Sequence, residues 1–218
     1  MEEDREGEPP PHEAPRTMSG APEHVVRLSA LMSTFDAPWA LCGGWAVDAW
    51  IGRQTREHGD IDIIVFQDDQ QTLFDHLAGW TMIAHGPYAG DADERWDGRR
   101  LELPVHIHIP AKFAFDNGRV YSEDGFTLEA ILNELSGGDW VLRREPMIGR
   151  DLSSCVRRSD WDIPTVVPEV LLFFKSLDLR GRDRADFAAL LPKLTATQRA
   201  WLREAVTLLG HPWEAQLR

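Results

Sequence analysis

Two aspartates one residue apart, Asp60 and Asp62, are the side chains in this sequence whose type and spacing best suit catalysis. They open a β-branched run, IDIIVF, which predicts a strand over residues 61–66. Side chains two positions apart on a strand point to the same face, so both carboxylates project together. Carboxylates this close repel each other, and a hard cation that prefers oxygen ligands relieves the repulsion. The pair therefore predicts a Mg²⁺ site.

A pair of glycines, Gly43 and Gly44, lies upstream of the aspartates. It follows the apolar run WALC at residues 39–42, which predicts a short buried strand that ends in a glycine turn. Because glycine has no Cβ, such a turn can bring backbone N–H groups up to phosphate oxygens. A lone glycine pair is usually only a turn, and a lone Asp-x-Asp is usually a pair of surface carboxylates. A glycine pair followed by an Asp-x-Asp at the start of an apolar strand indicates a site that binds phosphate and metal.

The elements expected around these residues form two lobes. Residues 1–22 are acidic and rich in proline, and we expect them to be disordered. Residues 23–160 alternate between helical and strand patterns, which predicts an α/β (α+β) lobe with a mixed sheet flanked by helices. Residues 161–218 change to amphipathic helical patterns from Val167 onward and predict a C-terminal helical lobe. Small-molecule sites tend to lie in the crevice between two such lobes.

The composition limits which partners and compartments fit. The chain has 218 residues, a formal net charge of −13 and two cysteines, Cys42 and Cys155. A protein that binds nucleic acid backbones is usually basic, so we expect no nucleic-acid partner. Two cysteines without a CxxC pair fit neither a disulfide framework nor a zinc cluster, and the simplest setting is a reducing cytoplasm. No apolar run approaches the roughly 18 residues of a membrane span.

The segment from Leu41 to Val65 closely resembles the aminoglycoside 2″-nucleotidyltransferase family, within the superfamily whose fold is named after DNA polymerase β. A second stretch resembles uncharacterised bacterial relatives that carry a Pro-Glu helix, a lysine one turn on and an Arg…Asp…Asp-Phe helix. Together the two cover most of residues 24–213 and are weakest over residues 85–125. The positions matched in the first segment, in order and without a gap, are Gly43, Gly44, Trp45, Asp48, Gly52, Arg53, Thr55, Arg56, His58, Asp60 and Asp62.

The resemblance implies a nucleotidyltransferase that transfers AMP from ATP to a hydroxyl group, releases pyrophosphate and uses two Mg²⁺ ions. The acceptor that it favours is a small polyhydroxylated molecule such as an aminoglycoside, which would make the protein an antibiotic-resistance enzyme. AMP transfer to a protein partner, as in antitoxin-type nucleotidyltransferases, is an alternative. A catalytically idle module that binds a nucleotide or a partner is another, although the intact Asp60 and Asp62 argue against it.

The family places a third carboxylate on the strand beside the aspartate pair, where it binds metal or deprotonates the attacking hydroxyl. Glu129 occupies the matching position by its distance ahead of GDWVLRR, although relatives often have Asp there. The run that contains it, FTLEAIL from Phe126 to Leu132, fits a helix or a strand by pattern alone. Glu102, in RRLELPV, is the rival candidate.

Two arginines follow the turn at Gly52 and are candidates for clamping phosphate. These residues, Arg53 and Arg56, both belong to the matched segment. Either can instead form an ion pair with Glu57 or Asp48, so the pattern leaves a structural alternative open.

The helix expected after Pro168 contains Lys175, which faces the cleft in the resemblance and can hold triphosphate oxygens as a point charge. Its alternative is a solvated helix lysine. Glu169 can orient the substrate or act as an auxiliary base, or it can complement the helix dipole from the first turn. Asp183 and Asp186 are better suited to joining the helical lobe to the first lobe than to chemistry.

Two further groups of polar residues are weaker candidates for a functional site. His106 and His108 share a strand face, but no third ligand follows at a zinc spacing, which disfavours a zinc site. Four loop acids can attract the ammonium groups of a cationic acceptor or can simply be solvated. These are Asp91, Asp93, Glu94 and Asp97.

Overall fold

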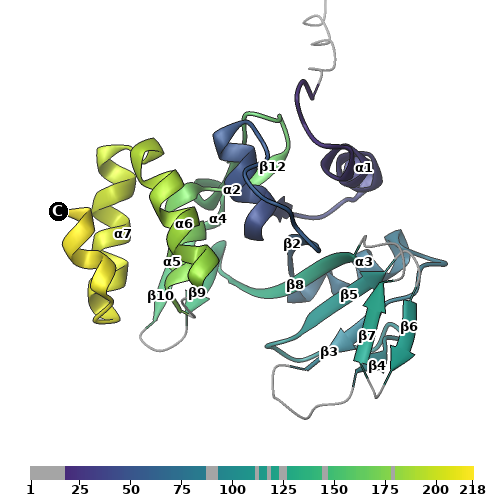
Figure 1. Ribbon diagram of the computed structural model, residues 1–218. Helices are drawn as coiled ribbons and strands as arrows, with labels where there is room; N and C mark the ends of the chain where they lie inside the picture. Colours follow the sequence, from purple (N-terminus) through teal and green to yellow (C-terminus); the bar gives the residue numbers. More distant parts are fainter. Residues whose placement is uncertain are drawn as a thin grey trace, which may run out of the picture.

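The computed structural model describes residues 18–86, 93–110, 113–116, 119–122, 127–143, 147–177 and 180–218. Over these residues the chain forms a mixed sheet flanked by helices and then a group of C-terminal helices, coloured light green to yellow in Figure 1. This mixed α/β arrangement confirms the predicted fold class. Residues 1–17, most of the segment that we expect to be disordered, lie outside the described part of the chain.

The main sheet has the strand order β11-β12-β1-β2-β8-β5-β3-β4. Strand β2 runs parallel to β8 and β1 runs parallel to β12, whereas the other neighbours in this order are antiparallel. The strands are β1 (Trp39–Leu41), β2 (Ile61–Phe66), β3 (Ile83–His85), β4 (Glu94–Arg95), β5 (His106–Pro110), β8 (Thr127–Ser136), β11 (Val156–Arg158) and β12 (Pro164–Val166). Because β2 and β8 lie in the middle of the order, their side chains meet neighbours on both sides.

Two smaller hairpins extend this arrangement. Strand β8 continues past the sheet into β9 (Asp139–Arg143), which pairs with β10 (Ile148–Asp151). The turn between β8 and β9 contains Gly137 and Gly138, both with positive φ. Strands β6 (Phe113–Asp116) and β7 (Arg119–Ser122) form a separate two-stranded sheet.

Alternation of burial explains why residues 127–132 form a strand. Over residues 127–132 of β8, every second side chain is buried, beginning with Leu128, and those between are half-buried. Strand β2 is buried almost throughout, with only Asp62 partly exposed, as suits a central strand with a β-branched sequence. Over residues 127–132, the described part of that run, the helix-or-strand ambiguity is therefore resolved in favour of a strand.

The helices are α1 (Glu23–Leu31), α2 (Gly43–Ile51), α3 (Gln70–His76), α4 (Leu152–Cys155), α5 (Pro168–Leu177), α6 (Gly181–Leu190) and α7 (Ala196–Leu208). Short 3-10 segments are η1 (Met32–Thr34), η2 (Gln67–Asp69), η3 (Leu191–Lys193) and η4 (Pro212–Leu217). Helix α2 packs against β2 on one side and against α5 and α6 on the other. It therefore joins the sheet to the C-terminal helices (Figure 1).

The division of the chain into lobes at residues 160/161 stays a proposal. Strand β12 follows that position and pairs with β1 in the main sheet. The helices that form the C-terminal group begin with α5 at Pro168. Over the described residues, no helix is both long and apolar enough to cross a membrane.

Candidate active site

Three carboxylates converge where β2 and β8 lie side by side. Asp62 on β2 and Glu129 on β8 are direct neighbours in the parallel pairing, and Asp60 immediately precedes β2. One oxygen from each of the three lies within 4.8 Å of the others. The structure thus places Glu129 on the strand beside the aspartate pair. Glu102 lies elsewhere, with its side chain 84% exposed and its carboxylate near Arg100 and Gln67.

Crowding of these carboxylates has an electrostatic cost. Burial, followed by the nearby charges of Asp60 and Glu129, raises the pKa of Asp62 from 3.8 to about 7. Burial likewise raises the pKa of the Cys42 thiol, and the same acids add to this effect. A hard divalent cation would remove the repulsion, and three converging oxygen donors match the ligands that Mg²⁺ prefers. The residues present therefore fit a magnesium site.

Both glycines of the predicted turn are required by close contacts. Gly43 has φ +64°, and a Cβ there would lie 1.7 Å from Asp62 Oδ2. At Gly44 a Cβ would lie 2.4 Å from Arg56 Nη2 and 2.5 Å from His58 Nδ1. The turn is also the first turn of α2 rather than a separate loop. The space that the missing side chains leave is thus occupied by the protein's own functional groups. The predicted approach of the backbone N–H groups to phosphate stays a prediction.

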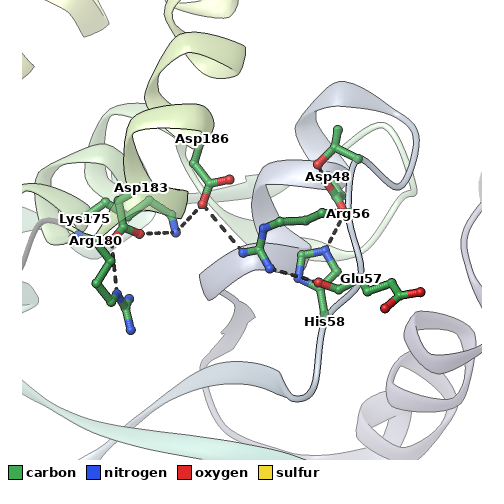
Figure 2. A network of polar contacts seen from close by, with 9 residues as sticks. Asp48, Arg56, Glu57, His58, Lys175, Arg180, Asp183 and Asp186 are labelled. Atoms are coloured by element: carbon green, nitrogen blue, oxygen red, sulfur yellow. Dashed lines mark hydrogen bonds and ion pairs between the residues drawn. The ribbon is translucent and has the colours of Figure 1, made fainter.

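Several other residues of the matched segment support the loop that leads to Asp60. Asp48 is fully buried, accepts a hydrogen bond from the Thr55 hydroxyl and lies 2.6 Å from His58 Nε2 (Figure 2). Burial opposes ionisation of Asp48, but the hydrogen bonds from His58 and Thr55 together lower its pKa. The His58 ring packs on Trp45 at a centroid distance of 4.3 Å. These contacts fix the path of the chain into the carboxylate group.

The candidate cations differ in where they lie. Arg53 is exposed and does not line the cavity, so the predicted phosphate contact has no support for this residue. Arg56 does line the cavity, and its guanidinium lies 3.8 Å from Asp186 on α6. It also donates from Nη1 to the Glu57 carbonyl oxygen at 3.1 Å. Arg56 forms no ion pair with the carboxylate of Glu57 or of Asp48, the two partners that were expected. The Asp48 carboxylate is instead engaged by His58 and Thr55.

Lys175 is buried in an ion-pair network at the wall of the cavity (Figure 2). Its side chain is 8% exposed, and its ammonium lies 3.2 Å from Asp183 and 2.7 Å from Asp186. The alternative of a solvated lysine is therefore wrong. Asp186 connects Lys175 on α5 to Arg56 in the segment between α2 and β2, which agrees with the joining function expected of this aspartate.

These groups surround a cavity of about 610 Å³. Its lining includes the three carboxylates, the glycines and His106, together with Arg56 and Lys175. Sequence analysis missed two further cationic residues of the lining and an apolar portion that contains two aromatic rings. These are Arg180, Arg182, Trp140 and Phe174. The Arg…Asp…Asp-Phe pattern was a signal for the two arginines, whereas only the fold shows which of the core aromatics lie at the cavity.

Glu169 does not belong to this site. It is 1% exposed and accepts hydrogen bonds from Arg150 at 2.9 Å and from Gln198 at 2.7 Å. These partners lie on β10 and α7, so Glu169 joins three elements away from the cavity lining. The hypothesis that it orients substrate or acts as a base is wrong, because its oxygens are already committed to structural partners.

The loop acids are paired within their own region. Among them, Asp93 contacts His85, Glu94 contacts Arg99, and Asp97 lies 3.7 Å from Arg99. None of these three lines the cavity, so they offer little support for capture of a cationic acceptor. The fourth acid, Asp91, lies outside the described residues.

Comparison with known proteins agrees with the sequence motif. Residues 24–88 match the family model described as aminoglycoside-2″-adenylyltransferase. The predicted family resemblance is confirmed. This match covers the glycine turn and both aspartates and ends before Glu129 and Lys175. No curated protein matches the sequence significantly.

Solved structures extend the similarity to most of the chain. Lincomycin-bound LnuA, a lincosamide antibiotic adenylyltransferase, is 20% identical, with 78% of this chain and 96% of that chain covered and a TM-score of 0.52. The antibiotic-resistance factor ANT(2″)-Ia in solution is 14% identical, with 84% and 89% covered and a TM-score of 0.52. The complex of ANT(2″)-Ia with adenylyl-2″-tobramycin is 13% identical, with 85% and 95% covered and a TM-score of 0.50. The chain therefore has the nucleotidyltransferase fold.

Proposed function

We propose that this protein is a nucleotidyltransferase that transfers AMP from ATP to a hydroxyl group of a small polyhydroxylated acceptor and releases pyrophosphate. The observation that carries the proposal is the convergence of Asp60, Asp62 and Glu129 within 4.8 Å at a cavity lined by Arg56 and Lys175. Oxygen donors for a cation and positive charges for phosphates thus face the same space. The adenylyltransferase family model and the adenylyltransferase neighbours support the same reaction.

The residues of the cavity have different roles in this reaction. Two Mg²⁺ ions bound by Asp60, Asp62 and Glu129 would stabilise negative charge on the phosphates and on the entering and leaving oxygens. Lys175 and Arg56, which line the same cavity, would hold triphosphate oxygens. The acceptor oxygen forms a bond to the α-phosphorus, and the bond from that phosphorus to the bridging oxygen breaks as pyrophosphate leaves.

Glu129 is suited to receive the proton of the attacking hydroxyl. Burial opposes its ionisation, but the hydrogen bond from His106 and the charges of His106, His108 and His85 together lower its pKa. The carboxylate is therefore ionised at neutral pH and can accept a hydrogen bond from the acceptor. Positioning of that hydroxyl beside the α-phosphorus would supply much of the rate enhancement.

An antibiotic is the acceptor class that the comparisons favour, because the neighbouring structures contain lincomycin and adenylyl-2″-tobramycin. An aminoglycoside acceptor and a consequent resistance function, in the cytoplasm where ATP is available, are part of the proposal. The described residues do not by themselves select an aminoglycoside over a lincosamide, because the candidate loop acids are paired internally.

The test is Mg²⁺-dependent pyrophosphate release from ATP in the presence of separate acceptors, with mass spectrometry of the products. The panel includes tobramycin, lincomycin and the proteins extracted from cells in which this chain is expressed together with its candidate protein partners. We expect a small molecule to gain the mass of AMP in wild type and not in Asp60→Asn. If only a co-expressed protein gains AMP, the small-molecule acceptor is wrong while nucleotidyl transfer stands. If no acceptor and no protein is modified, the proposed function fails.

A further inference from the structure

The histidine pair that did not fit a zinc site lies beside the third carboxylate. Strand β5 runs antiparallel to β8, with His106 opposite Ile131 and His108 opposite Glu129. Residues two apart on a strand share a face, so both imidazoles and the Glu129 carboxylate lie on the same side of the sheet. Register alone would favour His108 as the closer partner of Glu129.

Contacts reverse that expectation. His106 reaches diagonally along the sheet, and its Nδ1 forms a hydrogen bond with Glu129 Oε1. His108 Nε2 lies 3.9 Å from Glu129 Oε2, which is beyond hydrogen-bond distance. The His108 ring instead lies against His85, with centroids 5.2 Å apart, and His85 contacts Asp93. Of the two histidines, only His106 forms a hydrogen bond with the carboxylate.

Location distinguishes these histidines further. His106 lines the cavity with 44% of its side chain exposed, whereas His108 does not line it. Within the described ranges, the only set of His, Cys, Asp and Glu ligand atoms that converges is that of Asp60, Asp62 and Glu129. The histidines are outside this set, and the direct contact of His106 with it is the hydrogen bond to Glu129.

The Glu129 carboxylate needs a partner to stay where it is. A glutamate side chain has three rotatable bonds, and repulsion from Asp60 and Asp62 favours rotamers that move it away from them. A hydrogen bond to one oxygen opposes this movement and leaves the other oxygen available. The Nδ1–H can donate both from the imidazolium and from one neutral tautomer, so the hydrogen bond does not require a particular charge on the ring.

We propose that His106 is a positioning residue that holds the Glu129 carboxylate beside Asp60 and Asp62, in the geometry in which the three bind a divalent cation. This inference rests on the proposed function only in taking Glu129 as the third cation ligand. It assigns His106 no contact with metal, nucleotide or acceptor. Hydrogen-bond partners of metal ligands commonly change metal affinity or activity by about 10–100-fold when removed.

The chain offers matched variants for a test. His106→Leu removes the donor, whereas His106→Asn retains an N–H at the atom position equivalent to Nδ1. His108→Leu makes the same change two residues away on the same strand face. His106→Ala is a second donor-free variant for the case in which leucine at this position lowers expression. Melting curves verify that each protein is folded.

The first measurement is Mn²⁺ affinity of the nucleotide-free protein, by calorimetry. We expect His106→Leu and His106→Ala to weaken Mn²⁺ binding about 10-fold or more. His106→Asn and His108→Leu should remain within about 2-fold of wild type. Equal Mn²⁺ affinity in wild type and in both donor-free variants would overturn the inference, and so would equal losses from His106→Leu and His108→Leu.

The second measurement is steady-state turnover with ATP and an acceptor. His106→Leu should lower kcat about 10–100-fold with little change in KM for ATP, and His106→Asn should restore most of the loss. The two measurements separate the hypotheses. If wild type binds Mn²⁺ but transfers AMP to no acceptor, the proposed function fails, and the comparison of Mn²⁺ affinities still decides whether His106 positions Glu129.

Discussion

The Asp62 carboxylate occupies the space that a side chain at position 43 would need. An ideal Cβ built on Gly43 lies 1.7 Å from Asp62 Oδ2, and the Cys42 N–H donates to the Asp62 carbonyl oxygen at 2.8 Å. The start of α2 and the start of β2 are therefore in direct contact through both backbone and side chain. This contact explains in physical terms why a glycine is required so far ahead of the aspartates in sequence.

Gly43→Ala should displace Asp62 and abolish nucleotidyl transfer. Gly137 provides the control, because it has φ +61° against +64° at Gly43 but has nothing within 4 Å of its Cβ position. Gly137→Ala then reports backbone strain alone, expected at about 1 kcal/mol. Urea unfolding and pyrophosphate release would be measured for both. Similar losses of activity in the two variants would show that strain, and not the contact with Asp62, is responsible.

Local spacing was sufficient to predict this part of the site. Asp60 and Asp62 are two residues apart at the start of a β-branched run, so their shared face follows from the period of a strand. The glycine turn at Gly43 was predicted as well, but its contact with Asp62 was not. The neighbour that fills the space beside it comes from a different strand, and no pattern within residues 39–52 reveals that neighbour.

Asp62→Asn should stabilise the metal-free protein at alkaline pH while it abolishes activity. The pKa of Asp62 is raised in the folded state to about 7 from 3.8, so between these values the folded protein binds more protons than the unfolded chain. Stability from this group therefore falls as pH rises from about 4 to 7, and the full penalty is present above about 8. Asparagine carries no such penalty.

Melting curves at pH 5 and pH 8 without divalent cation test this prediction. We expect the variant to melt a few degrees above wild type at pH 8 and to differ less at pH 5, since 1 kcal/mol shifts the melting temperature of a chain this size by roughly 2–4 °C. Added Mg²⁺ should raise the melting temperature of wild type at pH 8 more than that of Asp62→Asn. A variant that melts below wild type at pH 8 would contradict the electrostatic explanation.

Glu129→Gln should lose turnover, whereas Glu102→Gln should be close to neutral. Glu129 lies beside Asp62 in the strand register, and Glu102 is an exposed side chain outside the carboxylate group. A group that acts as a cation ligand or base acts mainly in the transition state, so kcat should fall more than KM for ATP rises. Steady-state kinetics of both variants decide between them, and the opposite pattern would show that the wrong glutamate was chosen.

Non-local pairing limited what could be predicted about Glu129 and Lys175. The run around Glu129 alternates weakly, and its strand conformation depends on β2 and β5, which are distant in sequence. Lys175 was expected on a helix facing the cleft, and it is, but the two aspartates that neutralise it belong to the next helix. Helix periodicity describes which residues share a face of one helix, not which second helix packs there.

Lys175→Met should destabilise the fold and weaken ATP binding together. The buried ammonium is contacted by Asp183 and Asp186, and its removal leaves two buried carboxylates with only the arginines near them. Loss of one partner of a buried ion pair typically costs about 3–5 kcal/mol. Lys193→Met, at an exposed lysine on η3, is the control and should be near neutral. Urea unfolding measures both, and KM for ATP should rise only in Lys175→Met.

Asp186→Asn in the Lys175→Met background should recover part of the lost stability. In Lys175→Met the Asp186 carboxylate has lost its 2.7 Å partner and keeps only the more distant Arg56. The double variant removes that buried charge, so its free energy of unfolding should exceed that of Lys175→Met alone. In the wild-type background the same change should be destabilising, because Asp186 then contacts both Lys175 and Arg56. A cycle of the four proteins gives the coupling between Lys175 and Asp186. Additive effects would mean that the 2.7 Å contact contributes nothing to the junction between α5 and α6.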